Sequence, residues 1–178
     1  MLDSLSLKAE QDLDMGRSRN RITPEHLFED HFEAVHRYFV RRTSSLEDAQ
    51  DLTAETFAAT IDRPVPRKVE PLSWLYGIAR RKLADHLRKR RGAIPKAPDQ
   101  RDHGSTDRAI AIRLIVDRLP DDQREALLLQ SLEGLSVEQI GVAMGRSAGS
   151  VKALLQRAKE RVRSEGEAEF GQEAMEWK

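Results

Sequence analysis

Residues 136–163 carry the sequence SVEQIGVAMGRSAGSVKALLQRAKERVR, and this stretch predicts a helix-turn-helix. Ser136 and Gln139 form a capping box, in which each side chain can satisfy an unpaired backbone N–H of the other residue. Gly145 permits the positive φ of a tight turn, and Ser147 suits the N-cap of a longer second helix. The residues expected to face inward from that helix recur at helical spacing: Val151, Leu154, Leu155, Ala158 and Val162. This pattern is typical of DNA-reading units, although helical hairpins that bind no DNA can share it.

The longer helix is strongly basic, because residues 144–163 hold six Lys or Arg and one acid. Clustered positive charge favours a polyanion as partner, since neutralising phosphates releases counterions. In a major groove, base edges would meet the outward residues of its N-terminal half: Ser150, Lys152, Ala153, Gln156 and Arg157. Gln156 suits adenine and Arg157 suits guanine. Phosphate contacts are expected from Lys152, Lys159 and Arg161, for which simple solubility is the alternative interpretation.

Three more helices are predicted between residues 23 and 91. Thr23 and Pro24 suit an N-cap and a first helical position, and Ser45 precedes the second helix. The first helix, which ends near Arg42, carries Phe28, Phe32, Val35 and Phe39 at helical spacing. The inner side of the second helix holds Ala49, Leu52, Thr56 and Phe57. Its outer side is an acidic stripe, made of Asp48, Asp51 and Glu55.

A proline-containing loop over residues 62–71 separates the second helix from the third, because proline removes backbone donors. The third helix has apolar residues at helical spacing: Leu72, Leu75, Ala79, Leu83 and Leu87. Nine Lys or Arg and two acids fall within residues 67–91. This helix is therefore the second basic segment of the chain.

The composition limits the class of protein. The chain has 178 residues, a formal net charge of zero, 39% hydrophobic residues and no cysteine. The absence of cysteine excludes a disulfide framework, a thiolate zinc site and a cysteine nucleophile. No apolar run approaches the roughly 18 residues of a membrane span, and the polar N-terminus lacks a signal-peptide core. We therefore expect a cytoplasmic protein.

These patterns predict an all-α fold of two small helical domains joined by a flexible linker. The second domain would begin with helices carrying Ile115 and Leu119, then Leu127 and Leu128, before the helix-turn-helix. The linker shows no periodicity and contains proline and glycine. The expected boundaries are an N-terminal extension at 1–22, a first domain at 23–91, a linker at 92–107, a second domain at 108–163 and an acidic tail at 164–178.

Three pieces in this order resemble the extracytoplasmic-function sigma factors, group IV of the main bacterial sigma-factor family. They are DAQDLTAETF at 48–57, WLYGIAR at 74–80 with DHLR at 85–88, and Leu119-Pro120 leading to GSVK at 149–152. The resemblance implies a promoter-specificity subunit that binds core RNA polymerase and has neither a cofactor nor catalytic chemistry. The first domain would be region 2 and the second region 4, and an anti-sigma factor would be a further partner.

The resemblance also implies roles for particular residues. Docking on the polymerase is expected from the second helix, through Asp48, Asp51, Leu52 and Glu55. Melting and recognition of the minus-ten element are expected from Arg67, Lys68, Arg80, Arg81 and Arg88. Trp74 suits packing at least as well as base stacking. The recognition helix would read the minus-thirty-five element.

Two departures from the family pattern limit this transfer. Arg81 stands where many relatives have Asn, and Ala153-Leu154 replaces a common Ser-Arg pair. The base preferences of relatives therefore do not carry over to this chain.

Three alternatives stay open at this point. The first is a conventional helix-turn-helix regulator that binds duplex DNA without polymerase. The second is a metal site at Glu33 and His36, a Glu-x-x-His pair that would need a second pair and two more glutamates. The third concerns the acidic tail, which would mask a basic face of the protein or remain disordered.

Overall fold

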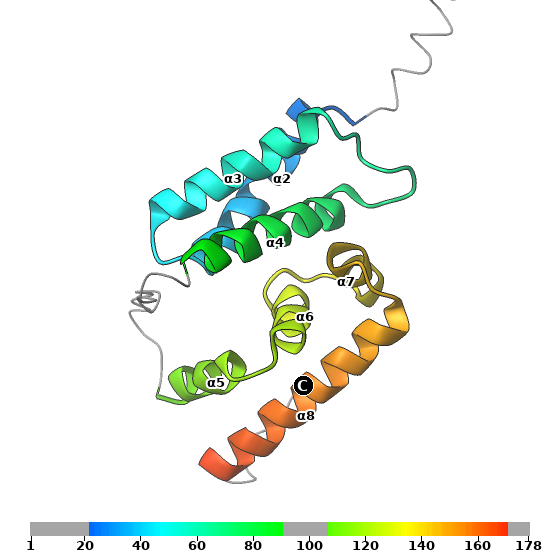
Figure 1. Cartoon of the computed structure of the whole chain (residues 1–178). Coiled ribbons are helices and arrows are strands. Elements are labelled where there is room, and N and C mark those ends of the chain that lie inside the picture. The colour runs from blue at the N-terminus through cyan, green and yellow to red at the C-terminus, as the bar shows by residue number, and fades with distance from the viewer. Residues whose placement is uncertain (1–21, 91–106, 171–178) are drawn as a thin grey trace, which may run out of the picture.

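The computed structural model describes residues 22–90 and 107–170. Within these ranges α-helices joined by loops are the only regular secondary structure, as predicted. The first unit contains helices α2 (Pro24–Val40), α3 (Leu46–Ile61) and α4 (Pro71–Arg90). The second unit contains α5 (Asp107–Asp117), α6 (Asp121–Ser131), α7 (Val137–Met144) and α8 (Ala148–Phe170). Figure 1 shows α3 and α4 running side by side, with α7 lying against α4 and the long α8 beneath.

Side-chain caps fix where the helices of the first unit begin. Thr23 accepts a hydrogen bond from the His26 N–H, and Ser45 accepts one from the Asp48 N–H, so both predicted N-caps are confirmed. A third cap was missed: the Glu70 carboxylate accepts hydrogen bonds from the N–H groups of Leu72 and Ser73 at the start of α4. Although partial burial favours protonation, the hydrogen bonds from Ser73 lower the pKa of Glu70.

The core of the first unit matches most of the predicted inward residues. Those confirmed as buried are Val35, Phe39, Ala49, Leu52, Thr56, Phe57, Leu75, Ala79 and Leu83. The expectation for Phe28 and Leu87 was wrong, because their exposed fractions are 46% and 45%. Phe28 lies at the edge of the core, with its ring edge-on to that of Phe57. Trp74 is partly buried and packs against the core.

The second unit contains the predicted helix-turn-helix. The capping box of Ser136 and Gln139 is present, and Gly145 adopts a left-handed φ of 64°. The turn is tight, because a Cβ added at Gly141 would lie 2.8 Å from the Arg146 carbonyl oxygen. All five inward residues predicted for α8 are buried. The helix continues to Phe170, beyond the predicted end near residue 163, and an Arg161–Glu165 ion pair spans its additional turn.

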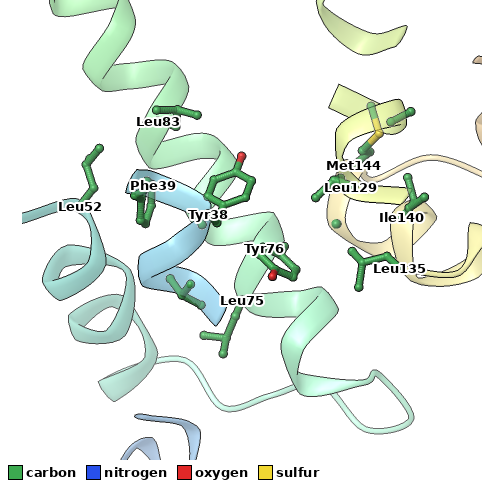
Figure 2. Packing of buried hydrophobic residues seen from close by; sticks show 14 of the residues in the cluster. Tyr38, Phe39, Leu52, Leu75, Tyr76, Leu83, Leu129, Leu135, Ile140 and Met144 are labelled. Carbon is green, nitrogen blue, oxygen red and sulfur yellow. The ribbon is translucent and has the colours of Figure 1, made fainter. Parts of the chain in front are cut away.

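The two units pack directly against each other through α4 and α7. Figure 2 shows Tyr76 on α4 pointing toward Leu135 and the residues around it in the second unit. Buried residues of both units belong to one continuous apolar cluster. Gly77 permits the close approach, because a Cβ there would lie 3.3 Å from the carbonyl oxygen of Ala143. The residues 91–106 that join the units lie outside the described ranges, as do 1–21 and 171–178.

No helix in the part of the chain that the structure describes combines the length and apolar character required to cross a bilayer.

Candidate nucleic-acid interface

The first half of α8 presents the side chains predicted to meet base edges. Ser147 accepts a hydrogen bond from the Ser150 N–H and so begins the helix. Lys152, Gln156 and Arg157 are exposed, and Ser150 and Ala153 are half-buried. The Gln156 amide donates to Glu160 at 2.9 Å, which holds it along the helix surface. The structure therefore brings the five predicted residues together on one helix.

A shallow groove of about 480 Å³ runs beside these residues, between α8 and the preceding helices. Val137 and Leu155 provide apolar surface in it. Its polar lining holds three cations and one acid, with two amides: Lys152, Lys159, Arg163, Glu160, Gln130 and Gln156. Within the described ranges, Lys152, Arg157 and Lys159 form no ion pair with an acid. Their charges are thus available to phosphates.

Arg146, which lies in the turn just before α8, was not among the residues predicted from the sequence. It is exposed and forms an ion pair with Asp122 of α6. The turn residues of a helix-turn-helix lie beside the DNA backbone when the second helix enters the groove. The sequence signal was its position between the turn glycine and the N-cap of α8.

The residues predicted for the minus-ten element do not form one surface. Arg67 and Lys68 are exposed in the loop before α4, and Lys68 has a positive φ of 67°, which is unusual for a residue other than glycine. Arg81 and Arg88 are exposed and stand seven positions apart on α4, so they share a face. Arg88 also forms an ion pair with Asp85.

Arg80 lies on a different side of α4, toward the second unit. Its Nη2 donates to the Met144 carbonyl oxygen at 3.4 Å, at the end of α7. The side chain is partly buried there. In this arrangement Arg80 contacts protein rather than a free DNA-facing surface.

A cleft of about 250 Å³ lies next to the proline-containing loop. It is lined by the beginning of α2, the end of α3 and the first loop residues, including Leu27, Ile61, Arg63 and Val65. The apolar walls suit an unstacked base, and Arg63 suits its phosphate, whereas Asp62 adds a negative charge to the same lining.

The acidic stripe of α3 lies beside the basic face of α4. Glu55 pairs with Lys82 at 2.9 Å, and Asp48 pairs with Arg90 at 2.5 Å and with His86 at 3.8 Å. Partial burial opposes ionisation of Asp48, but the Ser45 hydroxyl, Arg90 and His86 together lower its pKa. Two of the three acids are therefore partly neutralised within the chain, whereas Asp51 is exposed.

Leu52 was predicted to contact the polymerase, and its burial in the structure corrects that prediction. Only 4% of its surface is exposed, because its side chain packs in the core of the first unit. Position 52 faces inward on the same helix whose outer side carries Asp51 and Glu55. Leu52 can support a docking helix but does not offer a contact surface.

Glu33 and His36 do not lie in a cluster of metal-ligating side chains within the described residues. The His36 ring stacks on Phe32, and its Nδ1 lies 3.3 Å from the Thr53 hydroxyl. Among the described residues, no group of three His, Cys, Asp or Glu side chains is suitably placed to hold a metal ion.

Two family models match the chain in succession. The model described as sigma-70 region 2 matches residues 27–93, and the one described as sigma-70, region 4, matches residues 109–162. The region 2 match covers the first unit from Leu27 onward, and the region 4 match covers most of the second.

Curated relatives share these two regions. The ECF RNA polymerase sigma factor SigC of Mycobacterium tuberculosis is 34% identical over 142 residues, covering 72% of this chain and 76% of the relative. The ECF RNA polymerase sigma factor SigM of Bacillus subtilis is 27% identical over 156 residues, covering 80% of this chain and 94% of the relative.

Solved structures share the helical fold. The sigma factor RpoE of Bartonella quintana, in complex with the anti-sigma factor NepR, has a TM-score of 0.60 and 24% identity, with 77% of this chain and 92% of that chain covered. CnrH in complex with the cytosolic domain of CnrY has a TM-score of 0.58 and 21% identity, with coverages of 82% and 88%.

Proposed function

The chain belongs to the extracytoplasmic-function sigma factors of the sigma-70 family, and on that premise we propose how its two units divide the work. It is an alternative sigma factor, which binds core RNA polymerase and directs it to specific promoters. The observation that carries this conclusion is the succession of region 2 and region 4 matches in one chain.

The second unit reads the minus-thirty-five element through α8. The exposed Gln156 and Arg157 supply hydrogen bonds to base edges, and Lys152 and Lys159 neutralise phosphates. Arg146 in the turn exchanges its exposed ion pair with Asp122 for a further phosphate contact. The unpaired charges on this helix and the tight turn before it support this assignment.

The first unit recognises and melts the minus-ten element. Arg81 and Arg88 on the exposed face of α4 contact phosphates of the non-template strand, and Arg67 and Lys68 add positive charge in the loop before this helix. The cleft beside the loop receives an unstacked base. This opening is driven by binding free energy in the holoenzyme, so the chain has no catalytic chemistry of its own.

Docking on core polymerase takes place through the outer side of α3. Asp51 is exposed and forms no ion pair with another described residue, and Glu55 contributes although it is paired with Lys82. A sigma factor works with polymerase in the cytoplasm. Two structural neighbours were solved with NepR, an anti-sigma factor, and with the cytosolic domain of CnrY. We propose an anti-sigma factor as a partner of this chain as well.

Co-elution with core RNA polymerase from the same organism tests the docking assignment. Wild type is expected to co-elute on gel filtration, and Asp51→Lys is expected to lose most of this binding, because complementary charge orients the encounter. Glu29→Lys, an equal charge change at an exposed position on α2, is the matched control. Equal retention of all three proteins would remove Asp51 from the docking surface. Failure of wild type to bind, combined with tight binding to duplex DNA alone, would favour a conventional regulator.

A further inference from the structure

The groove beside α8 is built mainly by one stripe of that helix. Its α8 residues recur at helical spacing: Lys152, Leu155, Gln156, Lys159, Glu160 and Arg163. Gln130 of α6 and Val137 of α7 close the other side. These eight residues make up the basic groove.

The positive charge of the basic groove is not compensated among the described residues. Its three cations are exposed, and none of them forms an ion pair there. The acid of the lining, Glu160, accepts a hydrogen bond from the Gln156 amide rather than from a cation. Val137 and Leu155 give the groove an apolar floor. A ligand suited to this surface combines negative charge with an apolar or aromatic group.

The chain itself carries such a ligand. Residues 171–178, GQEAMEWK, follow directly after α8 and lie outside the described ranges. In an extended chain successive side chains alternate between two faces. Glu173, Met175 and Trp177 would then share one face, and Lys178 would lie on the other. The first face offers the acid and the apolar groups for which the basic groove is suited.

The order of these residues fits the groove when the segment runs back along α8. Gly171 comes directly after the last helical residue, where glycine favours a reversal of the chain. From the end of α8, Arg163 lies about 10 Å away along the helix axis and Leu155 about 22 Å away. An extended chain covers about 10 Å by Glu173 and about 23 Å by Trp177. The length of the indole ring offsets the part of this reach that the reversal uses. The acid can therefore meet Arg163, and the indole can meet the apolar floor.

We propose that residues 171–178 dock in the basic groove of the free chain and cover part of the surface with which α8 reads the minus-thirty-five element. Lys152 and Gln156 line the groove and also belong to the residues assigned to DNA, so DNA and the segment compete for them. The competition rests on the proposed function. The docking rests only on the groove and on the sequence of the segment. Promoter DNA must therefore displace the segment before it reaches the whole of α8.

Fluorescence of Trp177 in the free chain tests the docking. The chain has two tryptophans, so Trp74→Phe leaves Trp177 as the reporter. Docking shields the indole from acrylamide, an uncharged quencher whose access does not depend on nearby charges. Protection that disappears on dilution would overturn the proposal, because the segment of a second copy would then be the occupant. If Trp74→Phe lowers stability, the difference between wild type and Trp177→Phe reports the same signal.

Charge reversal in the groove separates docking from other causes of protection. Arg163→Glu should raise the quenching of Trp177 by acrylamide about twofold, and adding Glu173→Lys to the same chain should restore the protection by re-forming the pair in reverse. Arg118→Glu makes an equal charge change at an exposed position between α5 and α6, outside the groove, and is the matched control. It should leave the quenching unchanged. Equal quenching in Arg163→Glu and Arg118→Glu would overturn the proposal.

Removal of the segment tests the competition with DNA. Holoenzyme made with a chain that stops at Phe170 should bind a promoter fragment, selected from random DNA, more tightly than holoenzyme made with the full chain. The expected gain is about 3- to 10-fold, which corresponds to a groove that the segment occupies about 70–90% of the time. The gain should shrink as salt is raised, because salt screens the attraction between the segment and the groove.

The two measurements separate the docking from the sigma function. Equal promoter affinity of the two holoenzymes would overturn the competition, and with it the proposal, while leaving the sigma function intact. Failure of both holoenzymes to bind any promoter fragment would instead count against the proposed function. The fluorescence of the free chain would still decide whether the segment docks in the groove.

Discussion

The two basic helices, α4 and α8, have similar compositions but different surroundings. On α8 the charges of Lys152, Arg157 and Lys159 remain unpaired within the described ranges. On α4, Lys82 and Arg90 pair with acids of α3, and Arg80 contacts the end of α7. Arg161 of α8 pairs with Glu165, so α8 also loses some charge within the chain. Charge counted along a sequence therefore overstates the positive surface of both helices, and it does so more for α4. The contrast teaches that the neighbours of a basic helix decide how much of its charge is free for DNA.

The largest effect is expected from distorting the tight turn that positions α8. Gly141→Ala would place a Cβ 2.8 Å from the backbone oxygen of Arg146, which cannot move without distorting the turn. We expect a loss of about 1–3 kcal/mol in the free energy of unfolding, typical of overpacking. Urea unfolding followed by circular dichroism measures this change.

Gly149→Ala is the matched control for that variant. A Cβ at this position has no atom within 4 Å, and alanine is the better helix former. Its stability should equal or slightly exceed that of wild type. Equal unfolding midpoints for both alanine variants would contradict the role assigned to the turn.

An intermediate effect is expected from removing one arginine from each helix. Arg157→Ala should weaken binding of the holoenzyme to a promoter fragment, selected from random DNA, by about 10-fold or more, the usual value of a bidentate contact with guanine. Arg90→Ala makes the same change in charge, but Arg90 is already paired with Asp48, so a loss of less than about threefold is expected. Titration by fluorescence anisotropy compares the two. Equal losses of promoter affinity in the two variants would show that only net charge matters. The proposed difference between free charge on α8 and paired charge on α4 would then be wrong.

The smallest effect is expected from the pair that joins α3 and α4. Glu55→Lys and Lys82→Glu should each cost about 0.2–1 kcal/mol, because both side chains are substantially exposed. The double swap should restore most of this loss by re-forming the pair in reverse. Thermal unfolding of the four proteins gives the coupling energy. Additive losses in the double variant would mean that the pair adds nothing to stability.

Much of the fold follows from local sequence, and the agreement is best where the physics is local. The caps at Thr23 and Ser45, the capping box at Ser136 and the turn at Gly145 depend on residues within a few positions of each other. The errors lie at helix edges, where Phe28 and Leu87 continue the apolar period beyond the surface that their neighbours cover. Periodicity identifies a side of a helix but not how far along it a partner extends.

The candidate surfaces were predicted less completely, for a physical reason. The base-facing residues of α8 come from one helix, so spacing was sufficient to group them. Leu52 was assigned to a docking surface although it is buried, and Arg80 was grouped with residues that lie on another side of α4. No local signal distinguishes these cases, because each depends on which helix packs alongside.

By itself the sequence determined the helices, their caps and the tight turn, since each depends on short-range hydrogen bonding and apolar spacing. The order of region 2 and region 4 was implied by the resemblance of three sequence pieces to the family. Only the tertiary structure decided which charges are free. The buried Glu133 carboxylate accepts a hydrogen bond from the Tyr76 hydroxyl, 57 positions away, and nothing near Glu133 in the sequence distinguishes it from a solvated loop residue. Its burial follows from the close approach of α4 and α7, which brings donors from one unit to a carboxylate of the other. Such pairing over long sequence separation is a property of packing, which local patterns do not encode.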